Sequence, residues 1–228
     1  MAIAEFIWRL KRKGITLSEK VIRHMMKEEG VAALVPKRAK YSSYLGKITP
    51  EVDNIISRDF HAKQPYEKLL TDITEFALPD GKLYLSAMID CFDGMVIGWT
   101  IGPRPNADLV NTMLDGVIAV LPDGCYPMVH SDRGCHYQWP GWIQRMKEAG
   151  LTRSMSKKGC SPDNAACEGF FGRLKNEMFY GRSWIGVSPD DFAQELDDYI
   201  NWYNCKRIKL SLDGLSPIEY RQHLGCAV

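Results

Sequence analysis

The chain has 228 residues, of which 45% are hydrophobic and 25% charged, and its formal net charge at pH 7 is +1. This composition is typical of a soluble folded protein, with one large domain or a core that carries small appendages. No apolar run approaches the roughly 20 residues that a membrane-spanning helix needs. The first residues also lack the basic and then apolar order of a secretory signal. We therefore expect a protein without a membrane partner.

The seven cysteines form an odd set and include no Cys-x-x-Cys pair. A disulfide framework or a zinc knuckle would instead show an even number or paired spacings. Reduced thiols are typical of proteins in the cytoplasm. The sequence thus predicts a cytoplasmic protein, which would associate with the nucleoid if it binds DNA.

The small net charge conceals an uneven distribution of charged residues. Residues 1–70 contain 14 Lys and Arg against 8 Asp and Glu, and residues 133–175 contain 8 basic against 3 acidic residues. Positive charge therefore gathers in an N-terminal arm and in one later stretch, as phosphate binding requires. A solvated charged face accounts for this distribution equally well.

The N-terminal residues 1–35 predict two short helices, at 6–13 and 18–29, joined by a turn that contains glycine. Ser18 suits the N-cap of the second helix. This pattern indicates a partial helix-turn-helix segment. A bare helical hairpin packed on the core fits it about as well. Residues 36–65, which are rich in proline, lysine and serine, predict a basic linker.

Residues 66–180 have the pattern of an α/β core, and residues 181–228 predict a C-terminal helical extension of it. Turn signals separate the first three strand candidates, and helices alternate with the two later ones. The expected strands are 69–77, 82–90, 95–101, 127–132 and 151–156, and the expected helices are 106–121, 139–149, 163–180, 189–205 and 217–223. This order favours a five-stranded mixed sheet, three antiparallel strands and then two parallel ones, flanked by helices.

Three acidic residues carry most of the chemical information. Asp72 lies inside the first apolar strand, Asp132 ends the fourth strand, and Glu168 lies in the helix at 163–180. Carboxylates inside buried elements are unfavourable unless something compensates their charge. Mg²⁺ compensates them well, since it prefers oxygen ligands and is commonly held by carboxylates together with substrate phosphates. The three acids therefore indicate phosphodiester chemistry.

The helix that carries Glu168 has its own internal pattern. Ser161 or Asp163 suits its N-cap. Phe171 and Lys175 follow Glu168 by three and seven residues, so the three side chains share one face. A carboxylate that binds metal beside a lysine that binds DNA phosphate is one interpretation, and a solvent-facing pair on an amphipathic helix is the other.

Other polar residues allow more than one interpretation. Asp90 and Asp93 flank a turn and are expected to serve it, although their carboxylates lie near the sheet. His130 is either a partner of Asp132 or a buried, hydrogen-bonded histidine. Glu177 can extend the acidic site or pair with Arg173 four residues earlier.

Several segments closely resemble bacterial insertion-sequence transposases of the orfB type, whose DDE catalytic core is shared with retroviral integrases. The resemblance runs from about residue 15 to 223, and the segments that carry it are 71–74, 130–134, 163–177, 203–212 and 215–220. It implies an RNase H-like fold, in which Asp72, Asp132 and Glu168 are catalytic and bind two Mg²⁺ ions, with Mn²⁺ as a substitute. It also implies cleavage and transfer of DNA strands at the ends of an insertion sequence.

The resemblance extends to partners. Duplex DNA, from the element ends and the target, is the implied substrate, and a homo-oligomer on DNA is expected because two ends must be brought together. Relatives carry a longer helix-turn-helix region, so a partner reading-frame product is expected to supply the rest of it. A nuclease that only hydrolyses DNA and a catalytically idle, transposase-derived DNA-binding protein are the alternatives.

Four basic residues are the predicted DNA contacts. Lys175 matches the family's basic residue seven positions after the glutamate. Lys157, Lys158 and Arg133 are candidates because they lie near the predicted site in a positively charged stretch.

Overall fold

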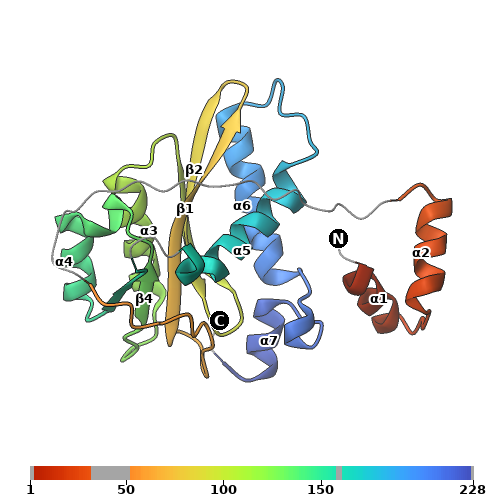
Figure 1. The fold of residues 1–228 in the computed structure, drawn as a ribbon, viewed down its shortest axis with the longest axis horizontal. Coiled ribbons are helices and arrows are strands. Elements are labelled where there is room, and N and C mark those ends of the chain that lie inside the picture. The colour runs from red at the N-terminus through yellow and green to blue at the C-terminus, as the bar shows by residue number, and fades with distance from the viewer. Residues whose placement is uncertain (1–2, 32–51, 158–160, 227–228) are drawn as a thin grey trace.

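The computed structural model describes residues 3–31, 52–157 and 161–226, and a five-stranded sheet forms its centre (Figure 1). The strand order is β3-β2-β1-β4-β5, with β1 to β3 antiparallel and with β4 and β5 parallel to β1. The strands are β1 (Lys68–Leu78), β2 (Gly81–Asp90), β3 (Val96–Gly102), β4 (Met128–Ser131) and β5 (Thr152–Met155). This topology confirms the predicted mixed sheet. Much of the predicted linker 36–65 lies outside the described residues.

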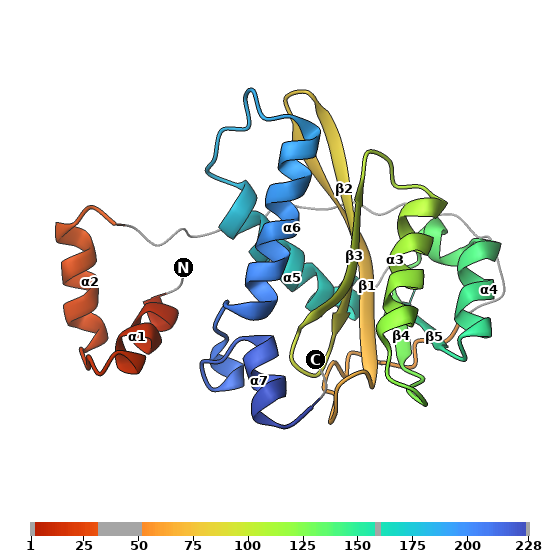
Figure 2. The same cartoon turned by 180° about the vertical axis from the view of Figure 1, so that it is seen from behind.

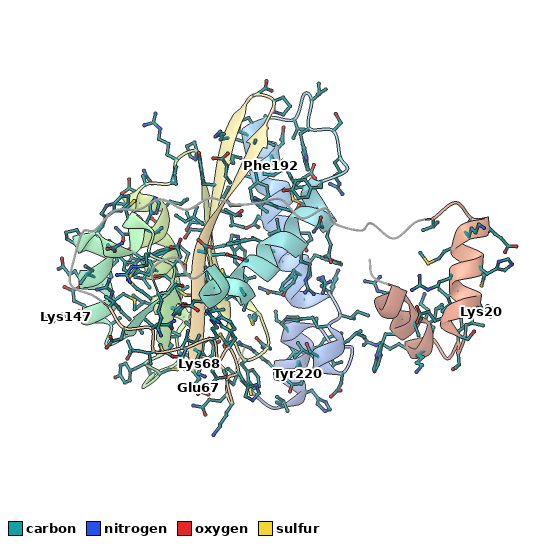
Figure 3. The ribbon with its side chains drawn as sticks, viewed as in Figure 1. Lys20, Glu67, Lys68, Lys147, Phe192 and Tyr220 are labelled. Atoms are coloured by element: carbon teal, nitrogen blue, oxygen red, sulfur yellow. The ribbon has the colours of Figure 1, made fainter. Side chains whose placement is uncertain are left out.

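Helices cover both faces of the sheet (Figures 1 and 2). On one face lie α3 (Ala107–Val120) and α4 (Pro140–Glu148), and on the other lie α5 (Ala165–Leu174) and α6 (Pro189–Cys205). Successive β1 side chains point to opposite faces. Leu69 therefore packs in the layer of α3, and Leu70 packs in the layer of α5 and α6. Phe192 of α6, labelled in Figure 3, is fully buried in the second layer.

The N-terminal helices α1 (Ile3–Arg12) and α2 (Glu19–Glu28) form a hairpin, and the hydroxyl of Ser18 caps α2 by accepting the Val21 amide at 3.4 Å. The expected pair of helices and the cap are confirmed. Arg12 donates to the carbonyl of Gly214 at 3.4 Å, so α1 touches the segment that leads into α7 (Pro217–His223). No helix in the described ranges is long and apolar enough to cross a bilayer.

A fully buried ionic cluster joins α7 to the turn between β2 and β3. Arg221 donates to Asp90 at 2.7 Å and to Asp93 at 2.6 Å, and all three side chains are inaccessible to solvent. The same carboxylates accept turn amides, Asp90 from Phe92 and Asp93 from Met95, each at 2.9 Å. The expected turn role of the two aspartates is confirmed. The cluster additionally fixes the C-terminal helix to the sheet.

A second ion pair joins the end of α5 to the segment after α6. The helix continues from α5 as a π-helical turn, Lys175–Phe179, in which Glu177 accepts Arg207 at 2.7 Å and the hydroxyl of Tyr199 at 2.8 Å. The expected pairing of Glu177 with Arg173 is wrong. A partner 30 residues away, in the segment after α6, replaces the neighbour one turn earlier.

We expect Arg221→Ala to lower the free energy of unfolding by about 3–5 kcal/mol, because it leaves two carboxylates buried without a cation. Arg182, which pairs at the surface with Glu195 at 2.8 Å, is the matched control. Its replacement by alanine should cost at most about 1 kcal/mol. Urea denaturation of both variants measures the difference, and equal losses would contradict a stabilising role of the cluster.

Candidate active site

The parallel pairing of β1 with β4 brings two of the predicted catalytic acids together. Thr71 of β1 stands opposite Ser131 of β4, so the next residues, Asp72 and Asp132, lie at neighbouring positions. A backbone amide holds one oxygen of each carboxylate at 2.8 Å, that of Ile73 for Asp72 and that of Gly134 for Asp132. The pairing of the two strands thus makes the two acids neighbours.

Glu168 lies in the first turn of α5, which packs against β1, and its side chain is exposed. The expected N-cap by Ser161 or Asp163 is wrong. The residue at the N-cap position is Asn164, whose side chain makes no capping bond. Asp163 is buried and instead accepts Arg58 at 2.7 Å, Asn54 at 2.8 Å and the amide of Lys157 at 3.0 Å. It thus ties the start of α5 to a loop about 105 residues earlier in the chain.

Asn164 is a site residue that sequence reasoning missed. Its amide nitrogen donates to Asp72 at 3.0 Å, and its amide oxygen is buried without a hydrogen-bond partner among the described residues. It precedes Glu168 by four residues, a spacing that places two helical side chains on one face. That spacing is the signal that could have identified it. Asn164 therefore connects the strand acid to the start of the helix that carries the third acid.

The three acids interact electrostatically. Burial raises the pKa of the Asp72 carboxyl to about 8, and the negative charges of Asp132 and Glu168 add to the rise. The hydrogen bonds from Ile73 and Asn164 act in the opposite direction. Burial likewise raises the pKa of Asp132. Within the described ranges neither carboxylate has an ion-pair partner, so the site gathers negative charge without a cation of its own.

This arrangement fits a divalent cation in its chemistry, because it offers carboxylate oxygens whose mutual repulsion a hard cation would relieve. In the part of the chain that the structure describes, no three acidic, histidine or cysteine side chains converge as a ready ligand set. The two strand acids are adjacent, and the exposed Glu168 acts on Asp72 from the helix.

Lys175 lies at the start of the π-helical turn and is half-buried. Its ammonium group is 5.3 Å from the ring centroid of Phe76, where a cation–π contact is favourable. Burial lowers its pKa, and the nearby carboxylate of Glu75 opposes this effect. Lys175 therefore packs its stem against the end of β1 and retains a charged group near the surface.

Two of the other predicted DNA contacts lie among the described residues. Arg133 directly follows Asp132 and is half-buried, and Lys157 is exposed just after β5. Lys158 lies outside the described residues. His130 is buried, with its two ring nitrogens 2.8 Å and 3.1 Å from the hydroxyls of Ser154 and Ser156. The interpretation of His130 as a buried, hydrogen-bonded histidine is confirmed.

The fold and the site resemble known proteins. The integrase core domain family matches residues 62–161, and a second integrase core domain family matches residues 168–224. The catalytic core of HTLV-2 integrase, solved in complex with magnesium, superposes with a TM-score of 0.55 at 13% identity over 69% of this chain and 97% of that chain. The fold is thus the RNase H-like fold of integrase catalytic cores. A simian T-cell lymphotropic virus intasome chain matches 75% of this chain with the same TM-score.

Curated relatives identify the family. The probable transposase for insertion sequence element IS1353 of Shigella flexneri is 55% identical over 95% of this chain, which spans 42% of that relative's length. The putative transposase InsK for IS150 of Escherichia coli (strain K12) is 40% identical, and the match covers 93% of this chain and 74% of InsK. Transposase InsF for IS3A of the same organism is 32% identical over 92% of this chain and 73% of InsF. The chain belongs to the insertion-sequence transposases with an integrase core domain.

We expect Asp72→Asn to raise the melting temperature of the metal-free protein, and to raise it more at pH 8 than at pH 5. The pKa of the Asp72 carboxyl is about 8 in the folded protein and near 4 in the unfolded chain, so the folded state binds this proton more tightly. The free energy of unfolding that this proton contributes is fully present below pH 4 and is lost as the pH rises through 8. Each kcal/mol shifts the melting temperature by about 2–4 °C in a protein of this size.

Thermal melts in EDTA across this pH range measure the effect, with the exposed Asp123→Asn as the control for a lost surface charge. A difference between Asp72→Asn and wild type that stays constant with pH would show that Asp72 titrates normally.

Proposed function

We propose that this chain is the catalytic part of a DNA transposase, which cleaves strands at the ends of an insertion sequence and transfers them to target DNA. The observation that carries the proposal is the pair of half-buried carboxylates, Asp72 and Asp132, on adjacent parallel strands of an integrase core. Glu168 would complete the set from α5. The names of the relatives support transposition as the overall activity.

Asp72, Asp132 and Glu168 would hold two Mg²⁺ ions, for which Mn²⁺ would substitute. The carboxylate oxygens of Asp72 and Asp132, which have no partner cation among the described residues, support this assignment, and the HTLV-2 core was solved with magnesium. Two such ions activate the attacking oxygen and stabilise the leaving oxygen of an in-line displacement. The attacker would be water when a strand is nicked and a DNA 3′-hydroxyl when strands are joined.

The protein's own part in this reaction is orientation. The amide of Asn164 and the backbone amides of Ile73 and Gly134 each engage one oxygen of a strand carboxylate. These bonds restrict rotation of both acids before a ligand arrives, and pre-oriented donors lose less entropy when the reaction complex forms. Asn164 would act through Asp72 and is therefore a positioning residue.

The DNA partners and the assembly follow from the same proposal. Arg133, Lys157, Lys158 and Lys175 would contact phosphates of the element ends and of the target. A homo-oligomer on DNA would bring two ends together, with a partner reading-frame product as a further component of the assembly. The protein would act in the cytoplasm on the nucleoid.

We expect Asp132→Asn to abolish strand cleavage and strand transfer in Mg²⁺ or Mn²⁺, because the neutral amide is a poor ligand for a hard cation. Binding to duplex DNA should stay within about twofold of wild type, since one charge changes inside the site. A gel assay with a duplex end and a preformed 3′-hydroxyl separates nicking from joining.

Asp123→Asn, an exposed change of the same chemistry, is the control and should keep both activities. Wild-type nicking without joining would identify a hydrolytic nuclease. Binding without either reaction would identify an idle DNA-binding protein, and full activity of Asp132→Asn would remove Asp132 from the catalytic set.

We expect Lys175→Ala to weaken duplex binding and to reduce the slope of log K against log salt by about 0.9, the value for one phosphate contact. It should also cost about 0.5–1 kcal/mol of stability, since the cation–π contact with Phe76 is lost. Fluorescence anisotropy at several salt concentrations tests the first effect, and Lys147→Ala, exposed on α4, is the control. An unchanged slope would make Lys175 a purely structural residue.

A further inference from the structure

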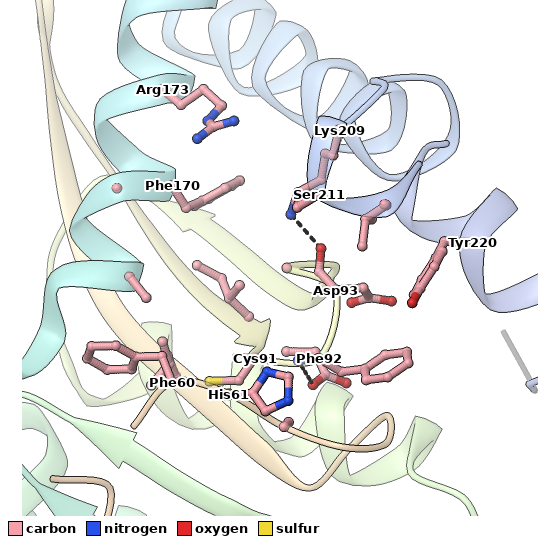
Figure 4. A pocket seen from close by; sticks show the side chains of 18 of the residues that line it. Phe60, His61, Cys91, Phe92, Asp93, Phe170, Arg173, Lys209, Ser211 and Tyr220 are labelled. Atoms are coloured by element: carbon pink, nitrogen blue, oxygen red, sulfur yellow. Dashed lines mark hydrogen bonds between the residues drawn. The ribbon is translucent and has the colours of Figure 1, made fainter. Parts of the chain in front are cut away.

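A cleft of about 830 Å³ opens beside α5 (Figure 4). Its walls come from the loop at 60–63, the turn at 90–94, α5 and the C-terminal segment 203–220. Ala166, Gly169 and Arg173 line it from α5, at the i, i+3 and i+7 spacing of a single helical face. Glu168 does not line it. The cleft is therefore distinct from the candidate active site, although one helix serves both.

The acidic groups at the floor of the cleft are already satisfied. Asp90 and Asp93 both accept Arg221 from the buried side, and both accept backbone amides of their own turn. A buried carboxylate with its oxygens engaged in this way is neutralised and offers little to a ligand. The cleft thus lacks a free anionic acceptor despite the two aspartates.

The basic groups of the cleft are not satisfied in the same way. Arg173 is exposed, extends from α5 toward Lys209 in Figure 4, and makes no hydrogen bond or ion pair with a described residue. Lys63, also exposed, has a side chain without such a partner in the described ranges. Lys209 donates to the carbonyl of Asp93 and lies 3.5 Å from the hydroxyl of Tyr203. The unused donors of the cleft are therefore cationic.

Repulsion between the positive charges of the cleft adds to this excess of unpaired cationic groups. Burial lowers the pKa of the Lys209 ammonium to about 8, and although Asp93 opposes this shift, the positive charges of Arg173 and Arg207 add to it. An anion between Arg173 and Lys209 would relieve the repulsion. The cleft is thus complementary in charge to a bound anion.

Half-buried aromatic rings complete the lining, and they favour a particular anion. Phe60, Phe92 and Tyr220 line the cleft, and the centroids of the last two rings are 5.8 Å apart. A basic groove with aromatic rings is the combination that binds single-stranded nucleic acid, in which phosphates meet cations and bases meet rings. An acidic peptide would satisfy the cations and would have no use for the rings.

We propose that this cleft binds a single strand of DNA, with Arg173 as the main phosphate contact, supported by Lys63 and Lys209. The proposal rests on the proposed function, since a transposase that cuts duplex ends handles frayed or unpaired strands next to its active site. A strand fits a walled cleft in a way that a duplex cannot, because a duplex presents its two phosphate backbones on a wide cylinder. The strand would pass one face of α5 while the reacting phosphodiester meets the other.

The experiment compares Arg173→Gln with wild type in binding a labelled 12-nucleotide single strand and a blunt duplex of the same sequence. Arg173→Gln should weaken binding of the single strand by about tenfold, as expected for the loss of one charge-assisted contact. The slope of log K against log salt should fall by about 0.7, the single-strand value for one phosphate. Blunt-duplex binding should stay within about twofold of wild type.

Two variants control for folding and charge. Arg173→Lys should recover most of the single-strand affinity, and Lys147→Gln should change neither affinity. Lys147 is exposed on α4, on the other side of the sheet from Tyr220 (Figures 1 and 3). The double variant Lys63→Gln/Arg173→Gln should bind the single strand more weakly than either single variant.

Three outcomes would overturn the assignment. The first is unchanged single-strand binding by the double variant, and the second is an equal loss for single strand and duplex. The third is competition by a poly-aspartate peptide as effective as that of an unlabelled strand of equal charge, which would indicate a general anion site. If the wild type nicks DNA and one of these outcomes is seen, only the cleft assignment fails. If the wild type neither binds nor cuts DNA, the proposed function itself fails.

Discussion

The parallel pairing of β1 with β4 is the constraint on which the candidate site depends. Because Thr71 stands opposite Ser131, the next residue of each chain segment is an aspartate at the same level of the sheet. A shift of one residue in this register would turn one carboxylate to the other face. The burial that specifies the register, with Leu69 and Leu70 packed in opposite layers, therefore also specifies the spacing of the acids. The contacts that stabilise the sheet therefore also position the two acids.

The elements of the fold were predictable because they depend on local patterns. The apolar strand at 69–77, the turn signal between it and the strand at 82–90, and the Ser18 cap each involve neighbours in sequence, and each is found where it was expected. The proximity of Asp72 and Asp132 was also predictable, since it follows from strand order. The contacts across the fold were not. Asn164 meets Asp72 across 92 positions, and Glu177 meets Arg207 across 30, and no local pattern selects either partner.

At the start of α5, long-range hydrogen bonds override the local preference for an N-cap. Asp163 has the side chain of a good N-cap, yet its oxygens are taken by Arg58, Asn54 and the amide of Lys157. A charged partner and two further donors outweigh a single capping bond, since charge-assisted hydrogen bonds are the stronger ones. This affects the candidate active site, because Asn164 takes the N-cap position instead and its side chain donates to Asp72.

Helix α5 contributes to both the candidate active site and the cleft, and it is anchored at its start and at its end. Its start is tied down by Asp163, and the π-helical turn at its end is tied down by the ion pair of Glu177 with Arg207. Between these anchors, Glu168 acts electrostatically on Asp72 and Arg173 lines the cleft. Any tilt of α5 would move both groups at once, so a ligand that fills the cleft would bias the position of Glu168 relative to Asp72. Binding of a strand on one side would then be coupled to assembly of the acidic set on the other, through a helix that both ligands contact.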